Sequence, residues 1–421
     1  MKHYPKDYVK EHLDTVILVA IFTPIDMEVL TPTAHAHKKI FITSADLPVN
    51  DRHLNFFDVI HIMKDNTDHE GVKEMLKPHI TNPKLTRVAL LNCLDNPLVT
   101  DIREHFDIPG PRFKDIETII SKDLGKKLFA KNGIKTPKHL IVDKEAYKKD
   151  SKAYAEYLKQ ELGMPMFGKR TFSSSGYGYC KIFSDEDLDN SLKMIAETDA
   201  EYEIEEFIDA GTISLDFFVI NNELVWYRCL RQAFPLCNVH EYKPSTGYLI
   251  PKTDPLYAQG LEVVQKAIKA LSPIYCNFGN IEGFETKDGI VFCELNYRRC
   301  GANHMAGYLY TEGYNGESLS IDLQWGQPIK LPKMDHEEPF KKYFCFFDFS
   351  LRPGKIVCKN ALPKDLKSEM KMDWICKNGE EFAEMKMRIG SAGYGVISNE
   401  SYEQLLKDIE LLGEWNAYVM E

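Results

Sequence analysis

The sequence predicts an α/β protein with several domains, and three observations support this prediction. Its 421 residues exceed what one ordinary hydrophobic core accommodates, so two or three domains are expected. Residues 1 to about 113 alternate near-continuous apolar strands with helices, a pattern typical of a doubly wound parallel sheet. Residues 279–298 read as a β-hairpin, so antiparallel pairing is expected further along the chain.

The N-terminal elements are predicted from apolar runs and helical periodicity. Strands are expected at 16–22, 39–43, 59–62 and 87–91, and helices at 69–79 and 98–106. No Gly-x-Gly-x-x-Gly follows the first strand, where residues 22–25 read Phe-Thr-Pro-Ile. A nicotinamide dehydrogenase is therefore discounted.

A further helix is predicted before residue 132. Leu124, Leu128 and Phe129 form its apolar face, and Asn132-Gly133 is a signal for its C-terminal end. Lys122 lies near its start and is a candidate functional cation. The alternative is an exposed surface lysine, which is the usual role of a lysine taken singly.

Residues 138–204 read as a smaller unit of mixed composition, with strands at 140–142 and 165–169 around a helix at 151–162. Lys169 ends the second strand and precedes a loop of hydroxyl residues and glycines at 173–178. Such residues let backbone N–H groups approach phosphate oxygens closely. A strand follows the loop, so it is not a P-loop, and a flexible hairpin tip is the alternative.

Residues 203–211 lead from this unit into a strand at 213–219. An extended segment here can present backbone groups and a carboxylate to an adenine ring. The alternative is an edge strand whose glutamates discourage aggregation.

The next strand, 225–231, alternates with period two, which places Arg228 and Arg231 on opposite faces. The remaining elements are expected as a mobile loop at 238–252, helices at 254–271 and 318–326, and a strand-rich region at 340–421 closed by a helix at 401–411.

The predicted hairpin at 279–298 projects Glu282, Glu294 and Asn296 in one direction. An all-oxygen site without Cys or His suits Mg²⁺, which completes its coordination with waters and nucleotide phosphates. The alternative is a solvated hairpin edge, where Glu and Asn are common.

Composition excludes some classes of function. The net charge of −11 and pI near 5.7 argue against a general nucleic-acid binder. The ten cysteines include no Cys-x-x-Cys pair and are interpreted as thiols in a reducing compartment. The apolar run Val16 to Phe22 is too short to span a bilayer and follows acidic residues, so a soluble, cytoplasmic protein without a membrane partner is expected.

The order of these signals resembles the ATP-grasp superfamily over residues 10 to about 330. The two hairpin carboxylates stand twelve positions apart, at 282 and 294, as in the biotin carboxylase branch. The resemblance implies an ATP-grasp fold with a small mixed lid subdomain and a large antiparallel-sheet subdomain. The expected boundaries are 1–113 for the N-terminal α/β domain, 114–204 for the linker helix and lid, 205–330 for the large subdomain with the metal site, and 331–421 for a C-terminal subdomain.

The resemblance also implies roles for individual residues. Arg298 and Lys169 are the expected catalytic residues, and Glu282, Glu294 and Asn296 the expected ligands of one or two Mg²⁺ ions, for which Mn²⁺ can substitute. The expected ATP-binding residues are Lys122, Lys169, Ser173, Ser174, Ser175, Gly176, Tyr177, Gly178, Glu205, Glu206, Phe207 and Ile208.

Three departures from the family pattern bear on function. Thr212 stands where many members carry a ribose-binding Glu, and Tyr297 replaces the proline of Glu-x-Asn-Pro-Arg. Ala302 occupies the position of the catalytic Glu of biotin carboxylases, which argues against carboxylase chemistry. Residues 351–357 and 388–397 look like the extra subdomain of ligases that join amino acids, of the L-amino-acid ligase or dipeptide synthase type.

The expected activity is that of a carboxylate–amine ligase, in which Mg-ATP converts a carboxylate into an acyl phosphate and an amine attacks to form an amide. Its partners are small carboxylates and amines, and a homodimer is expected from the family. Candidate substrate-binding residues are Arg228, Arg231, Arg298, Asn303 and His304, and for all of them except Arg298 a purely structural role is the alternative. Two alternatives remain: an ATP-grasp phosphotransferase and a non-catalytic nucleotide-binding protein.

Overall fold

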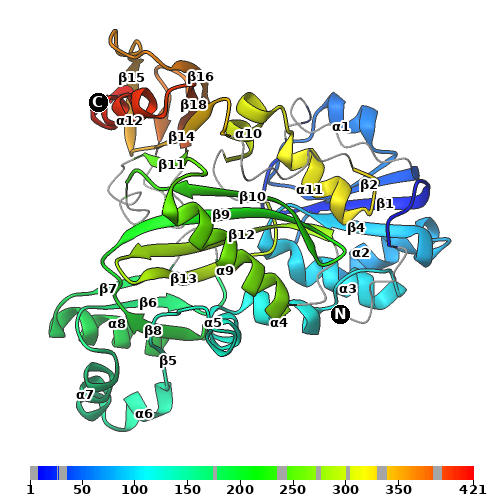
Figure 1. Cartoon of the computed structure of the whole chain (residues 1–421). Helices are drawn as coiled ribbons and strands as arrows, with labels where there is room; N and C mark the ends of the chain where they lie inside the picture. The colour runs from blue at the N-terminus through cyan, green and yellow to red at the C-terminus, as the bar shows by residue number, and fades with distance from the viewer. Residues whose placement is uncertain are drawn as a thin grey trace.

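The structure is a computed structural model that describes residues 8–25, 27, 36–173, 178–234, 244–271, 276–299, 304–329, 339–382 and 391–421. The four sheets form successive parts of the molecule, with a large sheet through the middle (Figure 1). Among the described helices, none is both long and apolar enough to cross a membrane.

The N-terminal part is a parallel sheet in the order β3-β2-β1-β4, which confirms the predicted parallel arrangement. Its strands are β1 (Leu13–Ala20), β2 (Ala36–Ser44), β3 (Val59–Met63) and β4 (Thr86–Leu90). Between and after them lie α1 (Asp51–Phe56), α2 (His69–Leu76), α3 (Asn96–Phe106) and 3₁₀ turns at Lys77–His79, Pro83–Leu85 and Cys93–Asp95.

Helices cover both faces of this sheet. Alternate residues of a strand point to opposite sides, and the apolar residues of β1 on each side pack against different helices. Ile17 and Val19 pack with the core that includes α2 and α3. Val16 and Leu18 pack in a second core with Trp325, which directly follows α11 (Gly316–Gln324). The Trp325 indole N–H also donates to the Ile17 carbonyl at 2.9 Å, so a late segment completes the N-terminal sandwich.

The small sheet is antiparallel, in the order β5-β8-β6-β7, and is joined to the first by two helices, α4 (Phe113–Ile120) and α5 (Lys122–Lys131). Its core packs Leu158 of one helix and Leu192 of another against strand residues such as Met166. The elements of this part are β5 (His139–Ile141), α6 (Lys144–Lys149), α7 (Ser151–Leu162), β6 (Met166–Arg170), β7 (Cys180–Ile182), α8 (Asp185–Glu197) and β8 (Tyr202–Glu206).

The large sheet has eight antiparallel strands in the order β13-β12-β9-β10-β11-β14-β18-β16. Val264 of α9 packs against Leu215 on one face, and Tyr308 of α10 packs against Trp226 on the other. The elements are β9 (Gly211–Ile220), β10 (Glu223–Arg231), β11 (Ser245–Leu249), α9 (Pro255–Leu271), β12 (Cys276–Thr286), β13 (Gly289–Asn296), α10 (His304–Glu312), β14 (Tyr343–Ser350), β16 (Glu369–Trp374) and β18 (Ser391–Asn399).

Two sequence predictions for the later part of the chain were wrong: that residues 238–252 form a loop, and that a helix closes the C-terminal region. The loop predicted over 238–252 contains strand β11, which pairs with β10 and β14. Because β14 pairs with β11, and β18 pairs with both β14 and β16, the C-terminal region continues the large sheet (Figure 1). The predicted final helix, α12 (Tyr402–Glu414), is followed by a strand, β19 (Tyr418–Met420), in a small sheet with β15 (Gly354–Lys359) and β17 (Glu381–Phe382).

Candidate functional site

The hairpin of β12 and β13 brings the expected metal ligands together. Glu282 lies directly opposite Glu294 in the antiparallel register, and a β-bulge follows this pair. The Asn296 amide nitrogen donates to Glu294 Oε1 at 3.3 Å, and Arg298 Nη2 donates to Asn296 Oδ1 at 3.2 Å. Four residues that the sequence singled out thus form one contiguous group.

The pKa values of the two facing carboxylates are shifted in opposite directions. Burial and the nearby Glu294 carboxylate raise the pKa of Glu282 to about 8. Burial also acts to raise the pKa of Glu294, but the ammonium groups of Lys122 and Lys169 outweigh it and lower this pKa to about 2. Opposite shifts of this kind are expected for two buried carboxylates that face each other, because two negative charges at this distance repel each other.

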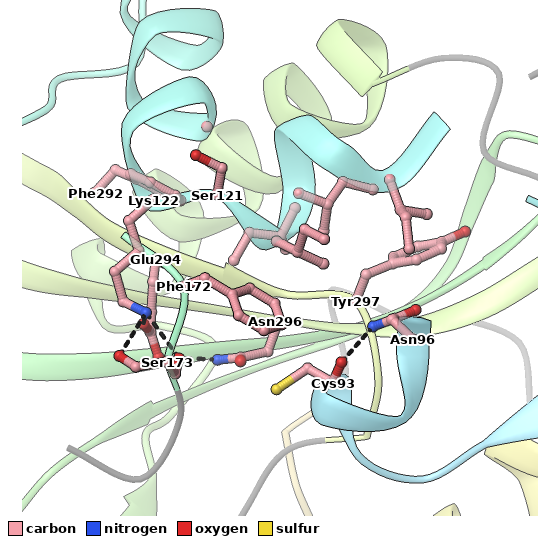
Figure 2. Close-up of a pocket in the computed structure, with 15 residues that line it drawn as sticks. Cys93, Asn96, Ser121, Lys122, Phe172, Ser173, Phe292, Glu294, Asn296 and Tyr297 are labelled. Atoms are coloured by element: carbon pink, nitrogen blue, oxygen red, sulfur yellow. Dashed lines mark hydrogen bonds and ion pairs between the residues drawn. The ribbon is translucent and has the colours of Figure 1, made fainter. Parts of the chain in front are cut away.

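Lys122 connects three parts of the site. It lies in the first turn of α5. Ser121 caps the N-terminus of this helix, because its hydroxyl accepts from the Leu124 N–H. The Lys122 ammonium lies 3.2 Å from Glu294 Oε2 and donates to the Ser173 carbonyl at 2.9 Å. Figure 2 shows this ammonium between Ser173, at the start of the hydroxyl-rich loop, and the metal hairpin.

A buried cluster of four charges lies beside it. Lys169 Nζ lies 2.8 Å from Glu205 Oε1, and Lys126 Nζ lies 2.5 Å from Glu203 Oε1 and also contacts Glu205. Burial acts to lower the pKa of Lys169, but neighbouring acidic groups, Cys293 and Glu205 foremost, raise it well above its usual value. Lys169 is therefore a fixed cation, as binding of a phosphate requires.

Sequence reasoning missed Lys126 and Glu203, although each obeys a simple periodicity. Lys126 lies one helical turn after Lys122 on α5, so both face the same side. Glu203 precedes Glu205 by two residues on β8, and alternate strand residues share a face.

The predicted adenine segment joins the small sheet to the large one. Glu206 ends β8, and its backbone N–H donates to the Lys138 carbonyl at 3.0 Å. The Phe207 N–H donates to the Pro165 carbonyl at 3.1 Å, and the Ile208 carbonyl accepts from the Ala210 N–H at 3.1 Å. The segment that connects β8 to β9 is thus held by backbone hydrogen bonds to Lys138, to Pro165 and within itself.

The remaining predicted residues lie in other contacts. Arg228 Nε donates to Glu312 Oε1 at 2.7 Å, and Arg231 forms ion pairs with Glu285 and Asp254. His304 Nδ1 lies 2.8 Å from a carboxylate oxygen of Asp216, in a buried cluster beside the hairpin. Gly178 has a φ of 75°, a conformation that favours glycine.

Some predictions fall outside the described residues. These are the ATP-binding candidates Ser174, Ser175, Gly176 and Tyr177, the substrate candidate Asn303, Ala302, and part of the motif at 388–397.

A pocket adjoins the charged group and is drawn in Figure 2. Its polar end is formed by Lys122, Glu294 and Asn296, and its other end by residues at the start of α3. Between them the wall is largely apolar. The lining residues are Cys93, Asn96, Ile116, Ile119, Ile120, Ser121, Lys122, Gly125, Phe172, Ser173, Phe292, Glu294, Leu295, Asn296 and Tyr297.

The donor set fits Mg²⁺. The hairpin offers the carboxylates of Glu282 and Glu294 and the amide oxygen of Asn296. Within the described part of the chain, no group of three or more His, Cys, Asp or Glu side chains could hold a metal ion without further ligands. Mg²⁺ is commonly held by one or two carboxylates together with phosphates and waters. A divalent cation would also favour the charged form of Glu282, whose pKa is raised by burial and by the Glu294 carboxylate.

The sequence comparisons concern the middle of the chain. A family model described as "D-ala D-ala ligase C-terminus" matches residues 128–295. The chain is 25% identical over 182 residues to a D-alanine–D-alanine ligase of Pelotomaculum thermopropionicum, a match to 41% of this chain and 55% of that protein. A ligase of the same description from Geobacillus thermodenitrificans is 27% identical over 180 residues, or 41% and 48%. The match therefore spans about half the length of these curated relatives.

Solved structures match nearly the whole chain. The L-amino acid ligase from Bacillus licheniformis has a TM-score of 0.73 at 15% identity and covers 97% of this chain and 98% of its own. N5-carboxyaminoimidazole ribonucleotide synthetase from Thermotoga maritima has a TM-score of 0.65 at 16% identity, with coverage of 97% and 100%. At these identities the comparison establishes a common fold.

Proposed function

We propose that this chain, whose fold is the ATP-grasp fold expected from its sequence, is an ATP- and Mg²⁺-dependent ligase that joins a carboxylate to an amine. The observation that best supports this proposal is that the Lys122 ammonium contacts both Ser173 and Glu294. This pair of contacts joins a loop of a phosphate-binding type to a hairpin of a magnesium-binding type. The names of the matched proteins support amide formation as the chemistry.

Each group has a physical role in this reaction. Lys122 and Lys169 are two cations whose charges suit the phosphates of ATP. Glu282, Glu294 and Asn296 would hold Mg²⁺, which when bound neutralises charge on the transferring phosphoryl group. Positioning and charge neutralisation are the main requirements of phosphoryl transfer, so a covalent nucleophile is not needed.

The bond changes balance in two steps. A substrate carboxylate oxygen takes the γ-phosphoryl group, which gives an acyl phosphate and ADP. The amine then attacks the carbonyl carbon, inorganic phosphate leaves, and the nitrogen loses a proton to form the amide. Arg298 lies beside Asn296 and its guanidinium suits the carboxylate and the developing phosphoryl charge.

We further propose that the protein works in the cytoplasm as a homodimer. The described cysteines are free thiols, which supports a reducing compartment. The dimer rests on the family resemblance, and sedimentation equilibrium tests it.

An ADP-release screen tests the reaction. Small carboxylates and amines, amino acids foremost, are supplied singly and in pairs with Mg-ATP, and products are identified by mass spectrometry. A ligase releases ADP rapidly only when both substrates are present and yields an equal amount of amide. ADP release with one substrate and a stable phosphorylated product would identify a phosphotransferase instead.

A further inference from the structure

A buried polar cluster lies directly beside the metal hairpin and centres on Asp216. This residue lies on β9, the strand that pairs with β12, and is fully buried. Its two carboxylate oxygens have separate partners. Oδ1 accepts from Ser214 Oγ at 3.1 Å and from Asn280 Nδ2 at 2.7 Å. Oδ2 accepts from Tyr308 at 2.5 Å and lies 2.8 Å from His304 Nδ1.

The Oδ1 side reaches the metal hairpin through one amide. Asn280 is opposite Asn296 in the register of β12 and β13 and is 1% exposed. Its Nδ2 donates to Asp216 and, at 2.5 Å, to Ser214, so its Oδ1 must face the other way. That oxygen accepts from Asn296 Nδ2 at 3.4 Å.

The consequence is a defined orientation of the Asn296 amide. Its nitrogen is occupied by Asn280 Oδ1 and by Glu294 Oε1, a bond drawn in Figure 2. Its oxygen is left on the side of Arg298. An amide coordinates a hard cation through oxygen and not through nitrogen, so this orientation decides whether Asn296 is a metal ligand at all.

We propose that Asp216 is a positioning residue which, through Asn280, holds the Asn296 nitrogen against Asn280 and Glu294 and so leaves the Asn296 oxygen to serve as a metal ligand. The inference rests on the proposed function, because it concerns the metal site of the same reaction. A group at position 216 that can only accept hydrogen bonds makes Asn280 Nδ2 the donor to it. Asn280 Oδ1 is then left to accept from Asn296 Nδ2. A carboxylate at 216 meets that requirement, whereas an amide can present its N–H₂ to Asn280 and turn both amides over.

The test measures Mn²⁺ binding to the full chain in the presence of ADP, by electron paramagnetic resonance of free Mn²⁺, without any turnover. We expect Asp216→Asn to weaken Mn²⁺ binding by about 10- to 100-fold, the usual effect of losing an outer-shell partner. ADP binding in EDTA should change by less than about twofold, because the hydrogen bonds of the cluster involve none of the predicted nucleotide residues that the structure describes.

Two further variants separate orientation from packing. Tyr308→Phe removes a hydroxyl from the Oδ2 side and leaves Asn280 in place, so Mn²⁺ binding should stay within about twofold of wild type. The exchange Asp216→Asn with Asn280→Asp reverses donor and acceptor while still offering an acceptor to Asn296. This double variant should recover Mn²⁺ binding to within about threefold of wild type.

The outcomes are distinct. Wild-type affinity in folded Asp216→Asn, equal loss in Tyr308→Phe, or no recovery in the exchanged variant overturns the positioning role. Absence of Mn²⁺ binding in the wild type overturns the metal site of the proposed function itself. Should Asp216→Asn fail to fold, Asn280→Leu removes the amide that links Asp216 to Asn296, and a Mn²⁺ affinity no weaker than that of Tyr308→Phe would overturn the proposal.

Discussion

Lys122 and Glu294 lie far apart in the sequence, yet the Lys122 ammonium is 3.2 Å from Glu294 Oε2. One residue comes from the helix that leads into the small sheet, and the other from the edge hairpin of the large sheet. Their ion pair locates the boundary between the two sheets, where proposed phosphate and metal groups meet. A ligand that bridges both sheets would therefore contact both residues.

The first prediction concerns Lys122. We expect Lys122→Met to lower kcat/KM for ATP by about 100-fold, the scale observed when one preorganised charge-stabilising group is removed. Steady-state ADP release measures it. Lys127→Met is the matched control, since Lys127 lies on the same helix with a 62% exposed side chain paired to Asp123. Equal losses in both variants would contradict a specific role for Lys122.

The second prediction concerns Lys126, which is fully buried between Glu203 and Glu205. Lys126→Met leaves the two carboxylates with less positive charge, and removing one partner of a buried ion pair costs about 3–5 kcal/mol. We expect the free energy of unfolding in urea to fall by that amount. The control Lys131→Met, at an exposed position of the same helix, should change it by less than about 0.5 kcal/mol. A small effect at Lys126 would show that this cluster adds little stability.

The third prediction concerns pH. Burial raises the pKa of Asp95 from 3.8 to about 7. The backbone N–H groups of Ile21 and Asn92 donate to its carboxylate and lower the pKa, but burial outweighs them. Because the folded state holds the proton more tightly than the unfolded state, this group lowers stability as pH rises from about 4 to about 7.

Asp95→Asn removes that titration. We expect the stability of the variant relative to wild type to increase by about 1–3 kcal/mol between pH 4.5 and pH 8, measured by urea unfolding. A difference between the two proteins that is the same at both pH values would contradict the raised pKa.

The fourth prediction concerns the metal hairpin. Glu294→Gln keeps the size of the side chain and removes its charge, so ATP turnover should fall by about 1,000-fold and Mn²⁺ binding with ADP should be lost. Glu223→Gln, at an exposed position of β10 in the same sheet, should retain both. Turnover that survives in Glu294→Gln would show that the carboxylate does not bind the metal.

Much of the fold was predictable because local pattern and packing agree. Strand β1 reads as a continuous apolar run and is buried on both faces. Strand β11 was missed because Ser245, Thr246 and Gly247 look like a loop. A Cβ at Gly247 would lie 2.6 Å from the ring of Phe346, so glycine there reflects a close approach between strands that no local pattern reveals. The packing of Trp325 on the first sheet is likewise a long-range contact.

The site was predictable in part. Lys122, Glu282, Glu294 and Asn296 were named from their order in the chain, and the structure brings them together. The buried partners were not named, because charged residues are exposed far more often than buried. Asp216 illustrates this, since its role as a positioning residue depends on neighbours from two other segments, β12 and α10.

The most direct test of the central claim follows an oxygen atom. With the substrate pair found by the ADP-release screen, the carboxylate is labelled with ¹⁸O and the products are analysed by mass spectrometry. An acyl phosphate passes one carboxylate oxygen to phosphate, so we predict one ¹⁸O in the released inorganic phosphate for each amide formed. Unlabelled phosphate would contradict the proposed reaction, because the oxygen that the carboxylate loses on amide formation would then have left in another product, such as AMP or water.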